Sequence, residues 1–383
     1  MKNLHRASSL IFFLLLYSCQ SAQQGDGKGS GSWPIFRGNP ALSGYADISL
    51  SRTPTLLWAY KSGERTSSSP VVQEQTTYWS DKRGRIYGVN IAGEQCFSYS
   101  FNSAVEASPT ICDSVLYIGR IDGTMSAISL ATADTLWSFE TQGQISAPPN
   151  MEMFGETAAI VFGSYDSYLY CIDRQTGKEL TRYASGYYIN GAAALWQGSL
   201  IFGGCDSWLR VVSSATGLPS DSLKLDTYIP ASPAVDNGAC YVADHFGNVY
   251  ELAIDDGKIR RSKKVVAATD ESSAFVSVPA LSPTTLFVLS DDRNLYAIDR
   301  KSGHVRWKYL QKGSAGESSP VVCRDKVIAC TKSGIVSLLS AESGELLWEY
   351  DTGEPITACP AVISGYFFIL TAKGTLFCFS AFS

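Results

Sequence analysis

Residues 295–307 read LYAIDRKSGHVRW, and residues 336–348 read VSLLSAESGELLW. Each stretch has an apolar strand pattern, a polar turn that contains Gly303 or Gly344, and a second strand that reaches a Trp. Glycine supplies the positive φ that such tight connections need. The two stretches begin forty-one residues apart, and an interval of about forty residues is typical of propeller blades.

The same unit recurs through most of the chain, and a proline marks the start of nearly every copy. These prolines are Pro70, Pro109, Pro148, Pro233, Pro279, Pro320 and Pro360, and Asn190-Gly-Ala-Ala-Ala194 fills the single gap. The strands that correspond to Leu295–Asp299 begin at Ile86, Met125, Leu169, Leu209, Val249, Leu295, Val336 and Leu376. Alternating or fully apolar runs of this length are typical of stacked four-stranded sheets. The sequence therefore predicts eight four-stranded units.

The first and last units are incomplete in a complementary way. Leu56–Tyr60 has the pattern of a fourth strand without the preceding three, and the chain ends after a third strand, Leu376–Ser380. Pairing the two ends completes an eighth blade and leaves no open sheet edge. We therefore predict an all-β fold, an eight-bladed β-propeller over residues 33–383, closed by pairing of the N-terminal strand with the C-terminal blade. An open solenoid would need polar caps instead.

The N-terminus has the pattern of an exported lipoprotein. Lys2, His5 and Arg6 precede the apolar run Leu10–Leu16, which is too short to span a bilayer and suits the core of a signal peptide. The next residues, Leu16-Tyr-Ser-Cys19, resemble a lipobox, so we expect a signal peptide over residues 1–18 and lipidation of Cys19. Gln20 after the cysteine indicates outer-membrane sorting, at the periplasmic face. Residues 19–32 are polar and Gly-rich, as in a flexible tether.

Composition excludes several functions. The formal net charge is −5, and because we find no basic run, we expect no nucleic-acid partner. The nine cysteines other than Cys19 cannot all pair, and several lie in apolar strand runs, where a thiol acts as a small hydrophobe. His245 and His304 are isolated, which excludes a His-rich metal site. Four aspartates recur at one position of the repeat, so we predict a turn role for them: Asp166, Asp206, Asp244 and Asp291.

The units from Leu56 onward resemble the pyrroloquinoline-quinone-type propeller repeat, in which a Thr-Gly-x-x-x-Trp segment docks each blade on the next. Ala341–Trp348 and Arg300–Trp307 match this motif, while Phe97, Tyr183 and Leu223 stand in for the Trp elsewhere. Trp33–Pro40 is also similar to the first segment of many members of this superfamily. The resemblance is specific for fold and weak for activity.

One branch of the superfamily is the quinoprotein dehydrogenases, which hold pyrroloquinoline quinone (PQQ) and calcium over the channel. The residues three before each repeat proline, or its substitute, are expected to approach the channel: Ser67, Glu106, Ile145, Asn190, Pro230, Val276, Glu317 and Thr357. Glu106, Asn190 and Glu317 carry oxygens of the kind calcium prefers. They lie on the second, fourth and seventh blades, so we favour a solvated polar funnel and expect no cofactor and no metal.

The other branch is the BamB family of outer-membrane assembly lipoproteins. That resemblance implies a non-catalytic scaffold that binds the barrel-assembly machine through a Leu-x-Leu-Arg loop and an acidic pair. Leu223 and Leu225 match the two leucines, Asp226 stands where Arg is expected, and Asp270 and Glu271 lie in the long connection Lys263–Ser277. Our expected function is therefore a lipid-anchored envelope scaffold. A PQQ-dependent dehydrogenase and a ligand-sensing propeller are the alternatives.

Overall fold

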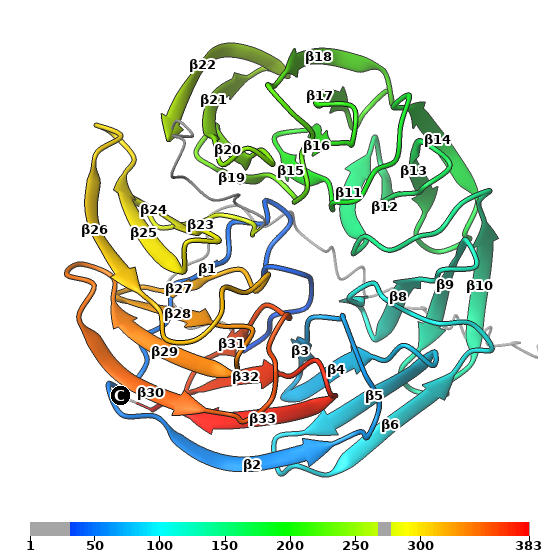
Figure 1. Ribbon diagram of the computed structural model, residues 1–383. Coiled ribbons are helices and arrows are strands. Elements are labelled where there is room, and N and C mark those ends of the chain that lie inside the picture. Colours follow the sequence, from blue (N-terminus) through cyan, green and yellow to red (C-terminus); the bar gives the residue numbers. More distant parts are fainter. Residues whose placement is uncertain (1–30, 267–276, 383) are drawn as a thin grey trace, which may run out of the picture.

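Seven four-stranded sheets and one five-stranded sheet surround a central channel, with the first strand of each blade toward the channel (Figure 1). The computed structural model describes residues 31–266 and 277–382. Cys19, the expected signal peptide, Asp270 and Glu271 lie outside these residues. Among the described residues, no helix is long and apolar enough to cross a membrane. The predicted all-β, eight-bladed propeller is confirmed.

The strands follow the order of the blades. Blade 1 holds β3 (Val71–Gln73), β4 (Thr76–Ser80), β5 (Arg85–Asn90) and β6 (Gln95–Ser100), and blade 2 holds β7 (Thr110–Cys112), β8 (Val115–Gly119), β9 (Thr124–Ser129) and β10 (Thr135–Glu140). Blade 3 holds β11 (Asn150–Phe154), β12 (Thr157–Gly163), β13 (Tyr168–Asp173) and β14 (Glu179–Ala184), and blade 4 holds β15 (Ala194–Trp196), β16 (Ser199–Gly203), β17 (Trp208–Ser213) and β18 (Pro219–Lys224). Blade 5 holds β19 (Ala234–Asp236), β20 (Ala239–Ala243), β21 (Val249–Asp255) and β22 (Lys258–Val266), and blade 6 holds β23 (Ala280–Leu281), β24 (Thr285–Leu289), β25 (Asn294–Asp299) and β26 (Val305–Leu310). Blade 7 holds β27 (Val321–Cys323), β28 (Lys326–Cys330), β29 (Ile335–Ser340) and β30 (Leu346–Asp351), joined by β1 (Tyr45–Ala46), and blade 8 holds β31 (Ala361–Ile363), β32 (Tyr366–Leu370), β33 (Thr375–Ser380) and β2 (Thr55–Lys61).

Blade 8 closes the ring with strands from the two ends of the chain. β2 pairs antiparallel with β33, and Trp58 lies opposite Cys378. The Trp58 indole N–H donates to the carbonyl of Ile91 in blade 1 at 2.8 Å, and its ring covers Gly93, where a Cβ would lie 2.9 Å from the indole. The predicted closure is therefore confirmed, and it joins blade 8 to blade 1.

The same contact fixes other blades to one another. Trp137 covers Gly177, and Trp307 covers Gly344. Phe97 occupies the equivalent position in blade 1, as predicted. Tyr183 and Leu223 do not occupy this position in blades 3 and 4. The strand register places Thr181 and Asp221 there, each opposite the third-strand residue that corresponds to the partner of Trp137 in blade 2. That part of the prediction is wrong: it took the nearest large apolar residue, which lies two positions farther along the strand.

Residues 33–46, which we call the belt, run along the inner strands and cross the channel (Figure 1). Backbone N–H groups of six blades donate to belt carbonyls at 2.8–2.9 Å, from Val72, Ile111, Leu195, Val235, Leu281 and Val322. Blade 3 joins through its Asn150 side-chain amide, which donates to the carbonyl of Pro40 at 2.8 Å. The belt thus ties seven of the eight blades to one segment.

Arg37 anchors the belt in the middle of the ring. Its side chain is 1% exposed, and its guanidinium donates to the carbonyls of two repeat prolines, Pro320 and Pro279, the second at 2.8 Å. Burial lowers the pKa of Arg37, and the nearby Cys359 thiol opposes this shift. A buried cation without a carboxylate partner depends on such carbonyl contacts. Gly44 makes room for it, because a Cβ there would lie 2.0 Å from the guanidinium.

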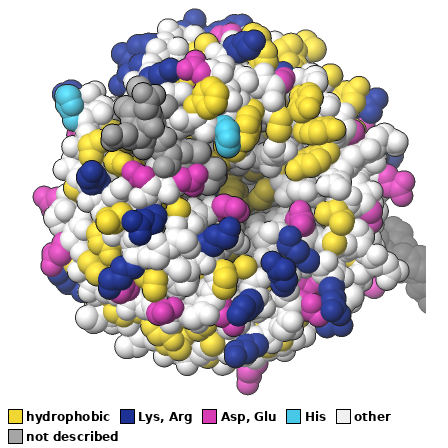
Figure 2. Space-filling model, in the orientation of Figure 1, with side chains coloured by type: hydrophobic (Ala, Val, Ile, Leu, Met, Phe, Trp, Pro, Cys, Tyr) yellow, Lys and Arg dark blue, Asp and Glu magenta, His cyan; other side chains and the backbone are white. Residues whose placement is uncertain are grey.

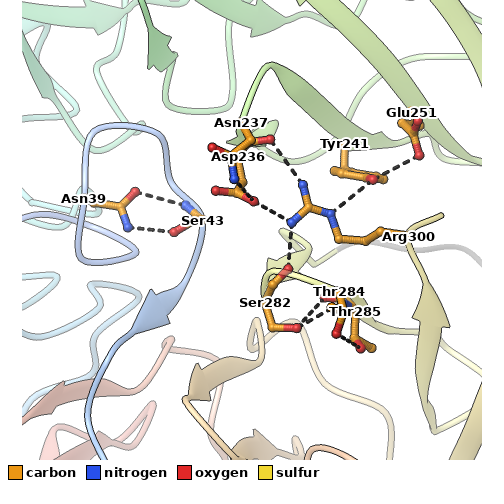
Figure 3. A network of polar contacts seen from close by, with 10 residues as sticks. All are labelled: Asn39, Ser43, Asp236, Asn237, Tyr241, Glu251, Ser282, Thr284, Thr285 and Arg300. Atoms are coloured by element: carbon orange, nitrogen blue, oxygen red, sulfur yellow. Dashed lines mark hydrogen bonds and ion pairs between the residues drawn. The ribbon is translucent and has the colours of Figure 1, made fainter. Parts of the chain in front are cut away.

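Arginines that directly follow third strands form a second contact between blades, and Figure 3 shows the network around one of them, Arg300. Arg300 of blade 6 donates to the Asp236 carboxylate of blade 5, to the Tyr241 hydroxyl at 3.3 Å and to the carbonyl of Ser282 at 2.6 Å. Arg174 pairs in the same way with Asp113 of the preceding blade, at 2.9 Å. These pairs fix the angle between neighbouring blades.

Aspartates stabilise the turns between second and third strands, but from two alternative positions. Asp244 occupies the first turn position, whereas Asp166 and Asp206 occupy the third, and each accepts backbone N–H groups of its own turn. The turn role predicted for these three is confirmed, although they do not share one position. Asp291 occupies the second position and lines the channel mouth, so the turn aspartate of blade 6 is Asp292.

We predict that Trp58→Ala lowers the free energy of unfolding by about 2 kcal/mol, because it removes an inter-blade packing contact and a hydrogen bond at the closure. Leu57→Ala in the same strand is the matched control, since Leu57 is 49% exposed, and it should cost less than about 0.5 kcal/mol. Urea unfolding followed by tryptophan fluorescence measures both. Equal, small effects would contradict the role of Trp58 in closure.

Asp291 and Asp292 should respond to pH with opposite signs. Partial burial and the carboxylates of Glu317 and Asp292 raise the pKa of Asp291 against the opposing effect of His245. Burial also disfavours ionisation of Asp292, but hydrogen bonds from the Tyr296 hydroxyl and the Asn294 N–H outweigh it and lower its pKa. The ionised Asp292 therefore stabilises the fold above the ordinary aspartate pKa of about 3.9. The contribution of Asp291 to the stability of the fold instead falls as pH rises past that value.

Between about pH 3.5 and pH 6.5, which brackets the ordinary aspartate pKa, Asp292→Asn should therefore lose stability relative to the unmodified protein. Asp291→Asn should gain stability over the same range. Urea midpoints at four pH values measure both differences. Shifts of the same sign in both variants would show that these carboxylates do not occupy the environments described.

Candidate functional site: the channel mouth

A hollow opens at the centre of what we call the upper face, which carries the turns between second and third strands and the connections between blades (Figure 2). The larger part has a volume of about 660 Å³ and the adjoining part about 370 Å³. Ligand sites commonly have volumes of about 300–1,000 Å³. The belt crosses the channel beyond the hollow, with Arg37 and Leu42 each 1% exposed. The hollow is therefore a funnel that ends blindly.

Four of the eight residues predicted to approach the channel line the funnel. Ser67 and Thr357 line the larger part of the funnel, Pro230 lines the smaller part, and Glu317 lines both. Val276 lies outside the described residues.

Ile145 is fully buried, so its predicted channel position is wrong. The strand register aligns Asn150 with Thr110, which makes Pro149 the repeat proline of blade 3 and Ser146 the channel residue. Because two prolines adjoin at 148 and 149, the prediction took Pro148 as the repeat proline and placed the channel residue one position too early.

The three candidate calcium ligands have other surroundings. The Glu106 carboxylate pairs with the Lys82 ammonium at 2.9 Å, and the Asn190 amide lies 2.8 Å from the Cys205 sulfur. Glu317 is exposed at the rim. Within residues 31–266 and 277–382, no three His, Cys, Asp or Glu side chains are placed to hold a metal ion together. Because calcium needs several converging oxygens, these residues do not fit the PQQ–calcium group of the dehydrogenases.

One side of the funnel is cationic. Arg65, Lys82, Lys332 and Lys373 line its larger part, with Glu317 as the acidic side chain among them. These residues come from blades 7, 8 and 1, and Figure 2 shows Lys and Arg side chains below the hollow. We did not predict this cluster from the sequence, because each blade supplies only one or two of its members and ring closure brings them together.

The opposite side, over blades 3 to 5, is aromatic. Tyr165 stacks on Tyr188 with ring centroids 5.3 Å apart, and Tyr187 packs against Tyr188 at 4.9 Å. His245 stacks on Tyr228 at 4.4 Å. Tyr187 and Tyr188 are 48% and 46% exposed, and hydrophobic side chains gather on this side in Figure 2. The upper face therefore carries a cationic wall inside the funnel and an aromatic cluster over blades 3 to 5.

The predicted partner-binding leucines differ in accessibility. Leu225 is 4% exposed and belongs to a core cluster, so it offers almost no surface in this structure. Leu223 packs partly against the same cluster and keeps some exposure. Asp226, at the position where the family has Arg, is exposed and pairs with Lys264 of blade 5 at 2.6 Å. The local charge is therefore different from the family pattern.

A basic run was missed in the sequence. β22 carries Lys258, Arg260, Arg261, Lys263 and Lys264 on the outer edge of blade 5, so the statement that no such run exists is wrong. Arg260 pairs with Asp255, Arg261 and Lys263 pair with Glu251, and Lys264 pairs with Asp226. Positive charge on an edge strand also discourages pairing with other sheets.

The nine cysteines other than Cys19 are all free thiols, and seven of them are buried. Burial raises the pKa of the Cys171 and Cys378 thiols to about 12, so both stay protonated at neutral pH. The interpretation of these strand cysteines as small hydrophobes is confirmed. The accessible thiols are Cys96 at the surface and the half-buried Cys205 in the turn between β16 and β17.

Comparisons with known proteins agree with this architecture. The chain matches the profile of a family described as outer membrane protein assembly factor BamB, over residues 47–205 and 193–383. BamB of Legionella pneumophila (strain Paris) is 24% identical over 169 residues, which is 44% of this chain and 41% of that protein. The aligned part therefore spans less than half of that relative.

Two solved structures show the same fold. BamB from Moraxella catarrhalis superposes with a TM-score of 0.71 at 17% identity, over 85% of this chain and 97% of that one. The quinohemoprotein alcohol dehydrogenase from Comamonas testosteroni superposes with a TM-score of 0.75 at 13% identity, over 91% and 80%. At these identities the superpositions establish fold alone. The profile match covers most of the chain, and on that basis this protein belongs to the BamB family of eight-bladed propellers.

Proposed function

We propose that this chain is a non-catalytic, lipid-anchored scaffold of the bacterial envelope that takes part in outer-membrane protein assembly by binding a protein partner. The family match over residues 47–383 carries the proposal. Cys19 would hold the lipid at the periplasmic face of the outer membrane. The barrel-assembly machine is the proposed partner, since the matched relatives are named as outer membrane protein assembly factors.

The channel mouth supports a binding role over quinone chemistry. Lys82 already neutralises Glu106, and three further cations, Arg65, Lys332 and Lys373, line the same side of the funnel. These positive side chains repel a divalent cation in the funnel and so oppose its binding. We therefore propose a role that uses no PQQ, no calcium and no nucleic-acid partner. Its function depends on surfaces that the rigid ring presents.

Leu223 is the proposed contact that the structure leaves accessible. It lies in β18, next to the exposed Asp226–Lys264 pair, and the connection that contains Asp270 and Glu271 follows β22 in the same region of the sequence. Partly exposed apolar side chains beside charged groups are common at protein interfaces. Leu225 would act indirectly, because its side chain holds the end of this strand in the core.

We predict that the tagged full-length lipoprotein recovers the barrel component of the assembly machine from detergent-solubilised envelopes. Leu223→Ala should reduce that recovery about fivefold, as expected for loss of about 1 kcal/mol at an interface. Leu218→Ala is the matched control, because Leu218 immediately precedes β18 and is 64% exposed. Quantitative mass spectrometry of the eluates measures the effect.

Recovery of no assembly component by the unmodified protein would contradict the proposed partner. Equal losses in the two leucine variants would contradict the proposed contact. Dye-linked oxidation of alcohols or sugars after addition of PQQ and calcium would contradict the non-catalytic role.

A further inference from the structure

We propose that the cationic wall of the funnel, formed by Arg65, Lys82, Lys332 and Lys373, is a binding site for an acidic segment of a polypeptide. The site lies at the channel mouth, whereas Leu223 lies in an outer strand. The proposal therefore goes beyond the scaffold function. It rests on the geometry and charge of the funnel and does not depend on which envelope protein is the partner.

The charge of this wall is opposite to that of the whole molecule. The chain has a formal net charge of −5, yet four basic side chains and one acidic side chain, Glu317, line the larger part of the funnel. Among the described residues, Lys82 is the member of this wall that has a carboxylate partner within ion-pair distance, Glu106 at 2.9 Å. A concave site lined by one sign of charge focuses the electrostatic field on an incoming ligand of the opposite sign.

The arrangement of the four cations favours a chain with several carboxylates over a single small anion. Lys332 belongs to a turn of blade 7, Lys373 to a turn of blade 8, and Lys82 to a turn of blade 1, so the charges follow an arc across three blades. An extended peptide carries side chains on one face at alternate residues. Its carboxylates can therefore reach successive turns, and several weak exposed pairs together give useful affinity.

The funnel also has a defined floor and an aromatic cluster on the same face of the ring. The belt closes the channel beyond it, so a bound segment would enter and leave through the upper face. Tyr165 and Tyr188 present stacked rings on the opposite side. Aromatic rings give contact area at a small cost in side-chain entropy. They can hold the apolar residues that lie between the acidic ones.

The basic strand β22 is the competing site for an acidic peptide. Four of its five cations have ion-pair partners among the described residues, which are Asp226, Asp255 and Glu251. The funnel wall has fewer such partners and is concave, whereas β22 is an outer edge. These differences favour the funnel.

The test uses the full-length lipoprotein in a non-ionic detergent and a fluorescein-labelled peptide of four Glu-Gly repeats, with a Gln-Gly peptide as the neutral control. Fluorescence anisotropy should show saturable binding of the Glu-Gly peptide. The binding should weaken as the salt concentration is raised, because salt screens the attraction between exposed charges. Lys332→Gln with Lys373→Gln should weaken binding at least about tenfold. Lys332→Arg with Lys373→Arg should retain it.

Lys258→Gln with Arg260→Gln removes the same charge from β22 and should change the affinity less than about twofold, as for a distant surface site. Circular dichroism of each variant checks that the fold is retained. The proposal is overturned if the peptide does not bind at low salt, or if the β22 variant loses as much affinity as the funnel variant. Displacement of the peptide by citrate at the same concentration of carboxylate groups would also overturn it, because the site would then take small anions.

Discussion

Closure of the ring by the pairing of β2 with β33 is the interaction on which the rest of the structure depends. A stack of four-stranded sheets has two open ends, and open edges invite pairing with other chains. Here β2, near the start of the fold, and β33, its last strand, form one sheet, so the ring cannot open without loss of this ladder and of the Trp58 contact with Gly93. Every turn that faces the channel keeps its place for this reason.

The belt gives the ring a second constraint, from inside. Seven blades donate hydrogen bonds to residues 33–46, and Arg37 holds the carbonyls of two repeat prolines. The result is a channel that is closed at depth and open at the upper face. The surfaces left open are the funnel and the outer strands. The cationic wall of the funnel depends on the closed ring, because closure brings blades 7, 8 and 1 together.

Much of the fold could be predicted from the sequence, because its signals are local: Gly at the turns, Trp in the fourth strands and prolines about forty residues apart. The belt could not, since its contacts use backbone carbonyls that have no signature in side chains. The predicted channel position of Ile145 was wrong because two adjacent prolines, Pro148 and Pro149, could each mark the start of blade 3. The cationic wall could not be predicted, because Lys82, Lys332 and Lys373 are far apart in sequence. The basic run of β22 is contiguous in the sequence and could have been predicted. The roles of Leu223, Asp270 and Glu271 depend on a partner and stay predictions.

Hydrogen exchange of the full-length protein, followed by mass spectrometry, tests the central claim that closure and belt hold the ring as one cooperative unit. We expect peptides that contain β2, β33 and the belt-bonded amides of Val72, Leu195 and Val322 to exchange together, at the rate set by global unfolding. Peptides from the centre of blade 4, such as β17, should exchange at that same rate. Faster exchange of β2 or of the belt-bonded amides, while β17 stays protected, would show that the ring opens locally and would contradict this account.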